Sequence, residues 1–280
     1  MKVVLIGHVC IDVNSSENSA YTSWGSALMY IAYYFHRQQG VTVELIAPYG
    51  NDFHEYAQVV TLLTPAVGAE TLLYRNVTQN NFRTQRCENA DIAQPINLTE
   101  ALKQHISEAN IVCLAPLLPN FGPDYVSEIM AAKSSDCISV LLPQGYFRTV
   151  EADTTTKPRE FEESEDVVPK FDLVILSDED HRDAAELAQC WARVTPASHI
   201  ILTQGSVGAS LVTATDVRFV RTDSVPEDQI VDSVGCGDTF AAAVMYSYAR
   251  DNDIKAAIQA GNLAARAKLF QARPLSQGFI

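Results

Sequence analysis

The chain has 280 residues, of which 47% are hydrophobic and 19% charged, and this composition predicts one large α/β domain with a buried core. The formal charge of −14 argues against a nucleic-acid partner, because such binding depends on Lys and Arg contacts to phosphates. The six cysteines are scattered without metal-ligand spacing, so we interpret them as free thiols of a cytoplasmic protein rather than as disulfides. The first twelve residues are apolar for too short a stretch to form a signal peptide or to span a membrane, and we expect the first strand there.

Short β-branched runs alternate with helical patterns along the chain, and this alternation predicts a doubly wound, mainly parallel sheet flanked by helices. Ligands of such sheets bind beyond the carboxyl ends of the strands, where loops lead into helix N-termini. We therefore expect the chemistry just after the strands. The predicted strands are residues 3–6, 41–46, 111–114, 138–142, 173–176 and 200–202, and the predicted helices are residues 26–38, 124–133, 181–193 and 239–250.

Two regions depart from this alternation of strands and helices. Residues 69–90 show strand-like alternation around the turn-prone segment 79–81, which predicts a hairpin that forms a small β flap, or lid, within the single domain 1–280. Residues 149–169 combine a threonine run, two prolines and a dense group of acidic residues, which favours a long, solvated loop.

The strongest chemical signal is the sequence DSVGCGDTF at residues 232–240, directly followed by a helix-forming stretch. Gly235 and Gly237 allow a ligand to approach the backbone, and their amides and that of Cys236 would form an anion hole at the helix N-terminus. Asp238 would stand at the edge of this hole, where it could accept the proton of a hydroxyl that attacks a phosphoryl group. The alternative is a glycine-rich turn in which Asp238 only caps the helix.

This segment resembles the C-terminal signature D-T-T-G-A-G-D-T-F of the ribokinase-like (PfkB) carbohydrate kinases, with Cys236 at the usual Ala position. Other segments match in the family's order: residues 4–12 resemble its opening strand, residues 24–28 its N-terminal Gly-Gly signature with Trp24 replacing the first Gly, and residues 202–209 its T-x-G-x-x-G segment. The resemblance implies Asp238 as catalytic base beside the 235–237 amides, substrate binding by Asp12, Gly25 and Ser26, and ATP binding by Ser177, Thr203, Gly205, Gly208 and Asn262.

The match has departures. Residues 172–180 align with a family motif, D-x-x-x-x-N-x-x-E, that is tied to magnesium and phosphate; Ser177 and Asp180 replace its Asn and Glu, and the resemblance implies Asp180 as the Mg²⁺ residue. The interval from Asp12 to Gly25 is shorter than the lid-building insertion of ribokinases, so we expect the flap to come mainly from residues 69–90. Residues 142–148 resemble a QGxxR segment of inositol-kinase-like members, which implies Arg148 in substrate binding; the alternative for Arg148, Arg83 and Arg86 is a solvated surface position.

The resulting hypothesis is an ATP- and Mg²⁺-dependent cytoplasmic kinase, monomeric or homodimeric, that acts on a hydroxyl of a small sugar or inositol-like polyol and has no membrane or nucleic-acid partner. A nucleoside kinase of the same fold remains an alternative. A non-catalytic regulatory protein on the kinase scaffold also remains an alternative, because Ser177, Trp24 and the short lid depart from the pattern.

No GxxxxGK[ST] motif and no GxGxxG after the first strand are present, which argues against P-loop kinases and dinucleotide oxidoreductases. His8 is interpreted as a packed core histidine.

Overall fold

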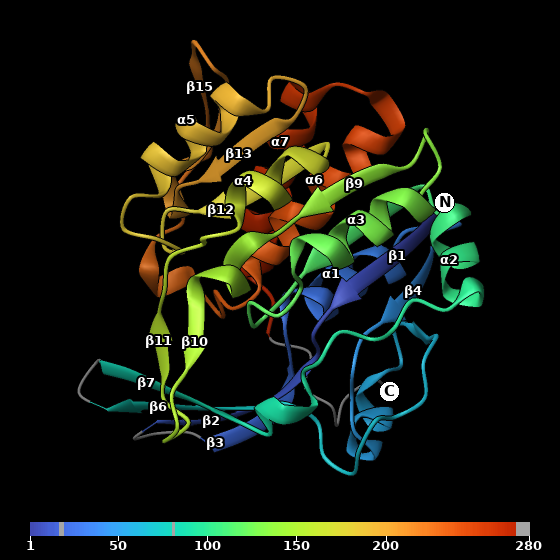
Figure 1. Cartoon of the computed structure of the whole chain (residues 1–280). Helices are drawn as coiled ribbons and strands as arrows, with labels where there is room; N and C mark the ends of the chain where they lie inside the picture. The colour runs from blue at the N-terminus through green and yellow to red at the C-terminus, as the bar shows by residue number, and fades with distance from the viewer. Residues whose placement is uncertain (17–19, 80–81, 273–280) are drawn as a thin grey trace.

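A computed structural model of the chain describes residues 1–16, 20–79 and 82–272, and a large twisted sheet runs through it (Figure 1). Within these ranges the sheet has nine strands, and the seven from β5 to β13 are parallel, while β14 and β15 continue it as antiparallel strands. In spatial order they are β15 (Val217–Arg221), β14 (Gly208–Val212), β13 (His199–Thr203), β12 (Leu173–Ser177), β9 (Ile138–Leu141), β8 (Ile111–Ala115), β1 (Lys2–Gly7), β4 (Thr42–Ile46) and β5 (Thr61–Leu62).

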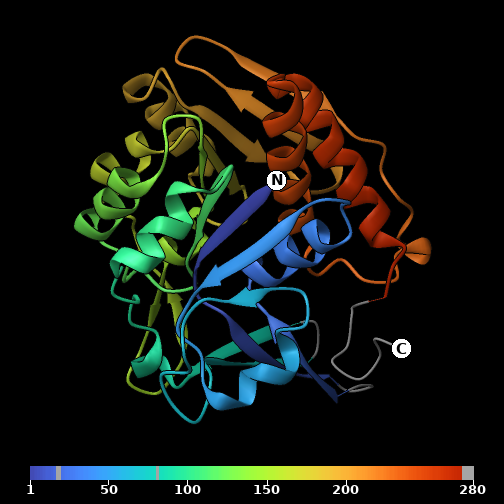
Figure 2. The same ribbon diagram turned by 90° about the vertical axis from the view of Figure 1, so that its right-hand side faces the viewer.

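Helices cover both faces of this sheet, as Figure 2 shows. Separate hydrophobic clusters lie under the two helical layers. The predicted doubly wound, mainly parallel fold is therefore confirmed. One layer contains α1 (Ala27–His36), α6 (Cys236–Asp251) and α7 (Ile254–Leu269); the other contains α2 (Glu100–Ser107), α3 (Pro123–Ala132), α4 (Ser164–Val167) and α5 (Ala184–Val194).

The sequence of β1 explains why helices must pack on both faces of the sheet. Val3 and Leu5 belong to the cluster under α1 and α6, whereas Val4 and Ile6 belong to the cluster on the opposite face. All four are fully buried. Successive side chains of a strand point to opposite faces, so a continuous apolar run can be stable only when helices pack on both sides.

A second, four-stranded sheet forms the flap, with the order β3 (Ala20–Gly25), β2 (Cys10–Ser16), β6 (Leu73–Gln79) and β7 (Phe82–Glu88). The hairpin predicted within residues 69–90 is present as β6 and β7, although the turn residues 80–81 lie outside the described ranges. The expectation that the flap comes mainly from this segment was wrong, because β2 and β3 form a hairpin of their own and pair with β6. The interval between Asp12 and Gly25, although short, is long enough for β2 and β3 to form this hairpin.

Gly7 marks the point where the chain leaves the main sheet for the flap. Its φ is +146°, and a Cβ atom there would lie 2.4 Å from the carbonyl oxygen of Ala115. A side chain at this position would therefore collide with the neighbouring strand β8. The close approach allows β2, and with it Asp12, to start directly beyond the carboxyl edge of β1.

The prediction of a long loop over residues 149–169 was also wrong. The segment holds the hairpin β10 (Arg148–Val150) and β11 (Thr156–Pro158) and the short helix α4, and this hairpin extends from the main body to the flap in Figure 1. At its tip the amide of Cys87 in β7 donates to the carbonyl of Thr154 at 2.8 Å. Phe161 and Val167 anchor the segment in the core. The acidic side chains Glu160, Glu162, Glu165 and Asp166 are exposed, as expected.

The six cysteines are free thiols, as predicted. In the part of the chain that the structure describes, no helix combines the length and the hydropathy that a membrane crossing requires.

Candidate active site

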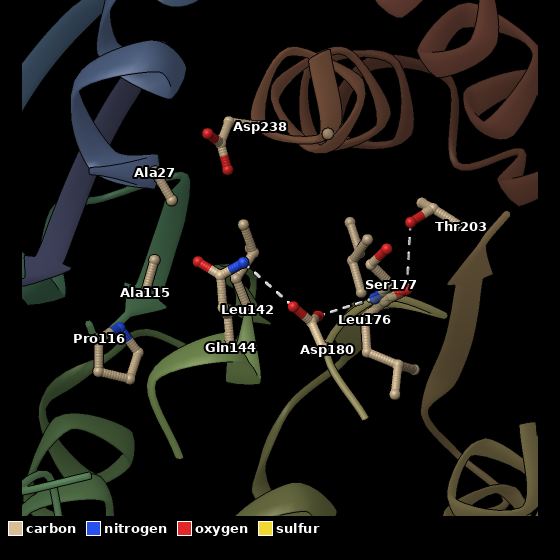
Figure 3. Close-up of a pocket in the computed structure, with 12 residues that line it drawn as sticks. Ala27, Ala115, Pro116, Leu142, Gln144, Leu176, Ser177, Asp180, Thr203 and Asp238 are labelled. Atoms are coloured by element: carbon tan, nitrogen blue, oxygen red, sulfur yellow. Dashed lines mark hydrogen bonds between the residues drawn. The ribbon is translucent and has the colours of Figure 1, made fainter. Parts of the chain in front are cut away.

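A pocket opens at the carboxyl edge of the parallel strands, where the loops after β8, β9, β12 and β13 meet the N-termini of α1 and α6 (Figure 3). The space within it, including its open mouth, is about 480 Å³. Three of the residues predicted to bind donor or metal, the predicted base Asp238 and one glycine of the predicted anion hole line it. The lining residues are Ala27, Ala115, Pro116, Leu142, Gln144, Ile175, Leu176, Ser177, Asp180, Thr203, Gly237 and Asp238.

The glycine-rich turn before α6 has the conformation that an anion-binding helix start requires. Gly235 is the N-cap with φ +79°, and a Cβ atom there would lie 2.2 Å from the Cδ1 atom of Tyr30. Both the backbone angle and the contact with the aromatic ring therefore favour glycine. The first turn of a helix leaves its N–H groups without intrahelical partners, and Gly237 and Asp238 carry two of these groups at the pocket.

Cys236 contributes less to the predicted anion hole than expected. Its amide donates to the carbonyl of Ser233 at 3.3 Å, which closes the turn that leads into α6. Burial raises the pKa of its thiol to about 11, so the side chain is a neutral thiol at physiological pH. In this arrangement the amides of Gly237 and Asp238 are better placed to receive an anion than that of Cys236.

Asp238 stands in the first turn of α6 and its carboxylate points into the pocket (Figure 3). Burial raises the pKa of this carboxyl to about 7, and the negative charge of Asp180 adds to the effect, while Arg148 opposes it. A carboxyl with a pKa near neutrality can accept a proton and release it at physiological pH.

Asp180 follows β12 and lies on the opposite side of the pocket. Its Oδ2 accepts from the amide of Ser177 at 2.8 Å, and its Oδ1 accepts from Nε2 of Gln144 at 3.1 Å. Burial raises the pKa of Asp180, and these hydrogen bonds oppose that rise. Gln144 is the Gln of the QGxxR segment but was given no role of its own in the sequence-based hypothesis; that resemblance and its position just after β9 were the available signals.

The Asp180 carboxylate also bears on metal binding. Among residues 1–16, 20–79 and 82–272, no three His, Cys, Asp or Glu side chains are grouped closely enough to hold a metal ion by themselves. Mg²⁺ commonly takes one or two protein carboxylates and completes its shell with phosphate oxygens and water. Asp180 fits that mode of binding together with a phosphate ligand.

Asp12, Gly25 and Ser26 come together at the flap side of the site. Strands β2 and β3 pair Cys10 with Gly25, and a Cβ atom on Gly25 would lie 2.5 Å from Oδ2 of Asp12, so the Asp12 carboxylate packs directly on the backbone of Gly25. Ser26 is the N-cap of α1 and adopts φ 85° and ψ 151°, a strained conformation for a residue with a side chain. Ala27, the next residue, lines the pocket.

Two hydroxyl groups near Asp12 are buried without a hydrogen-bond partner in the described part of the chain, namely Oγ of Ser23 and Oγ of Ser26. Ser23 pairs with Asp12 across the antiparallel strands, so the two side chains share a face of the flap. Buried hydroxyls are normally satisfied. These groups therefore fit a polar ligand on the flap side of the site.

Arg148 begins β10, the arm that joins the main body to the flap. Its positive charge lowers the pKa of both Asp180 and Asp238 and also that of Cys10 on β2. The guanidinium is therefore close enough to interact electrostatically with Asp180 and Asp238 in the pocket and with Cys10 in the flap. Arg148 is half-buried, and it is not among the residues that line the pocket.

The predicted nucleotide-binding residues are not all brought to the pocket. Thr203 lines it and donates to the carbonyl of Leu176 at 3.3 Å. Gly205 starts the short 3-10 helix after β13, and Gly208 has φ +131° with the carbonyl oxygen of Val220 only 2.3 Å from where its Cβ would be. Asn262 is buried between α7 and β15, where its Nδ2 donates to the carbonyls of Val220 and Arg221 at 2.9 and 3.4 Å.

His8 has the structural role that its sequence context predicted. Its Nε2 donates to the carbonyl of Ala93 at 2.8 Å, which leaves Nδ1 to accept from the amide of Leu117 at 2.9 Å. Burial lowers the pKa of the imidazole to about 4, so the ring is neutral. Through these hydrogen bonds it holds the loop after β8.

A doubly wound sheet whose carboxyl edge presents a glycine-rich helix start beside a carboxylate defines a class of α/β proteins that bind phosphorylated ligands. Residues 67–274 match the sequence profile described as "pfkB family carbohydrate kinase", and the chain belongs to this family. None of the curated proteins matches the chain significantly.

Solved structures share the fold over almost the whole chain. One is a pyrophosphate-dependent kinase in the ribokinase family complexed with a pyrophosphate analog and myo-inositol, with TM-score 0.76, 18% identity and coverage of 98% of this chain and 97% of that chain. Adenosine kinase of Anopheles gambiae has TM-score 0.73 and 15% identity, with coverage of 99% and 98%. Arabidopsis thaliana ribokinase, complexed with ribose and ATP, has TM-score 0.69 and 14% identity, with coverage of 98% and 94%. The chain therefore has the ribokinase fold.

Proposed function

We propose that the protein transfers the γ-phosphate of ATP to a hydroxyl group of a small sugar or polyol, with Asp238 as the general base. The observation that carries this proposal is the place of Asp238 in the first turn of α6, where one pocket receives both its carboxylate and the amide end of a long helix. Phosphoryl transfer needs these two elements together, because the site must bind a phosphoryl group and deprotonate the hydroxyl that attacks it.

On the donor side, the amides of Gly237 and Asp238 and the dipole of α6 bind the transferring phosphoryl group. Mg²⁺, when bound with the donor, neutralises phosphate charge, and Asp180 is the residue that would hold it. Ser177 and Thr203 line the same side of the pocket. The Nδ2 atom of Asn262 already donates to two carbonyls, so only its Oδ1 is left for the proposed contact with the nucleotide.

On the acceptor side, Asp12 and the two unpartnered hydroxyls of Ser23 and Ser26 offer a set of polar groups. A molecule with several hydroxyl groups satisfies such a set better than a flat base does. Arg148 would complete this wall from the β10 arm. This polarity supports a sugar or polyol acceptor in preference to a nucleoside.

The competing interpretation is a regulatory protein that binds a sugar or nucleotide without turnover. The carboxylate of Asp238 in the pocket, at the amide end of α6, argues against it, since a protein that only binds its ligand has no need of a base there. Fold similarity alone does not decide between the two.

The test is a screen for acceptor-dependent product formation. ADP release would be measured with ATP and Mg²⁺ over a panel of monosaccharides, inositols and nucleosides, and phosphate release with pyrophosphate as donor, because one structure of this fold belongs to a pyrophosphate-dependent kinase. We expect turnover with a sugar or polyol. Donor binding without turnover on any acceptor would support the regulatory interpretation instead.

A further inference from the structure

Lys268, in the last turn of α7, is buried although it carries a positive charge. The residue is 5% exposed, whereas lysines normally keep the ammonium group in water because its desolvation is costly. Three oxygen atoms surround the ammonium: the carbonyl and Oδ2 of Asp232 and the carbonyl of Gln271, each 3.4 Å from Nζ. The side chain therefore reaches back from the helix end to a specific set of acceptors.

Asp232 is the first residue of the glycine-rich segment that ends in Asp238. Its amide and that of Val231 donate to the carbonyl of Leu269 at 3.4 and 2.8 Å, so the end of α7 holds the start of this segment through the backbone as well. Its Oδ1 accepts from the amide of Val234 at 3.1 Å, which fixes the next turn of the segment. One carboxylate thus links Lys268 to the turn that precedes Gly235.

We propose that Lys268 is a positioning residue that acts as a built-in cation for the phosphate-binding turn. Its ammonium holds Asp232, and through Asp232 the turn 232–237, in the shape that presents the first amides of α6 to the pocket. It also places a fixed positive charge behind a segment that receives anions. The inference rests on the proposed function only in naming that anion as the transferring phosphoryl group.

The chemistry of the three oxygens gives this proposal a specific consequence. Two carbonyls and a carboxylate are the ligand types that also replace the hydration shell of a monovalent cation. Removal of the lysine side chain should leave a small cavity with these oxygens still in place. Ammonium or K⁺ added to the solution could then restore what the lysine supplies, whereas the larger tetramethylammonium ion could not.

The experiment compares the variants Lys268→Ala and Lys268→Met with Lys255→Met as a matched control, because Lys255 is an exposed lysine of the same helix. The first readout is hydrogen exchange of the amides in residues 232–238, and the second is the affinity for inorganic pyrophosphate by calorimetry. Neither depends on turnover. We expect faster exchange in this segment and about tenfold weaker binding in both Lys268 variants, with no change in the control.

The rescue experiment then adds ammonium, K⁺ or tetramethylammonium chloride to Lys268→Ala at constant ionic strength. Recovery of slow exchange with ammonium or K⁺, but not with tetramethylammonium, would support the built-in cation. Failure of both small ions to restore slow exchange, or equal recovery with all three salts, would overturn it. So would slow exchange and wild-type pyrophosphate affinity in the Lys268 variants without added salt.

A variant that removes the ammonium beside the half-buried Asp232 carboxylate could destabilise the whole fold and not only the turn. The double variant Lys268→Met with Asp232→Asn removes both charges and keeps the volume. It should fold and still bind pyrophosphate weakly, and wild-type affinity in it would contradict the proposal. If the wild-type protein binds pyrophosphate but turns over no acceptor, the proposed function fails, while the exchange and affinity measurements still decide the role of Lys268.

Discussion

Asp180 and Asp238 line the same pocket from opposite sides, and burial together with the negative charge of Asp180 raises the pKa of Asp238 to about 7. The two residues come from distant parts of the chain, the loop after β12 and the first turn of α6. Arg148 opposes the shift from a third element, β10. The protonation state of the proposed base is therefore set by side chains that only the fold brings together.

This relationship predicts the pH dependence of turnover. A general base must be unprotonated, so kcat should fall as the pH falls through about 7, the pKa of Asp238. Arg148→Met removes a charge that lowers this pKa and should move the midpoint to higher pH. Arg182→Met, which changes an exposed arginine of the α5 side, should leave the midpoint in place. A wild-type profile that is flat from pH 5 to 9 would contradict the assignment.

The same shift predicts how stability changes with pH. In the unfolded chain Asp238 titrates near its ordinary value of 3.8, whereas in the folded protein it titrates near 7. Between these values the folded state holds a proton that the unfolded state has lost, so the contribution of Asp238 to stability falls as the pH rises from about 4 to 7. Asp238→Asn should therefore become progressively more stable than the wild type over that interval. Denaturant unfolding at several pH values measures this, and a constant difference would contradict the raised pKa.

Replacing Ser26 by Gly should relieve backbone strain but weaken binding of the acceptor. Its φ of 85° disfavours any residue with a side chain, so Ser26→Gly should not destabilise the protein and could stabilise it by about 1 kcal/mol. Loss of the hydroxyl should raise the KM for the acceptor by about tenfold while the KM for the donor stays constant. Asn252→Gly is the control, since Asn252 also has positive φ, at the end of α6. An unchanged acceptor KM would remove Ser26 from the acceptor site.

The Asp180 carboxylate should determine the magnesium requirement. Because the pocket offers no set of three metal-binding side chains among the described residues, loss of Asp180 should be felt mainly at low magnesium concentration. Asp180→Ala should raise the concentration of Mg²⁺ that gives half-maximal turnover by about tenfold and lower saturated turnover less. Glu179→Ala, a change at an exposed neighbour, should not affect the titration. An unchanged titration in Asp180→Ala would exclude Asp180 from the metal site.

The main sheet could be predicted from the sequence because its strands are short β-branched runs and both of their faces are buried. The turn proposed to be catalytic was recognisable because its glycines and Asp238 are close in the chain, so their spacing carries the signal. Asp12 and Gly25 could be assigned to the proposed site only from the family resemblance, because the β2–β3 hairpin that brings them together was not expected.

Other parts depend on contacts that no local pattern records. The acidic composition of residues 149–169 favoured a loop, yet Phe161 and Val167 are enough to anchor the segment and the hairpin tip pairs with β7. The contact of Gln144 with Asp180 forms because β9 and β12 are neighbours in the sheet. In the sequence, nothing distinguishes Lys268 from other lysines near helix ends, because its contact with Asp232 forms only in the folded chain. These residues have in common that their partners are distant in sequence.

The central claim is that Asp238 removes the proton from the acceptor hydroxyl, and turnover of Asp238→Asn tests it most directly. Asn keeps the shape of the side chain but cannot take the proton, so kcat should fall by roughly 10²–10⁴ while donor affinity changes little. Asp253→Asn provides a matched control for helix capping, because the side chain of Asp253 accepts from the amides of Lys255 and Ala256 at the start of α7. If Asp238 only caps α6, both variants should retain activity, since Asn caps a helix nearly as well as Asp. Near-wild-type turnover by a folded Asp238→Asn protein would contradict the account, and a loss of two or more orders of magnitude with intact donor binding is the result that it predicts.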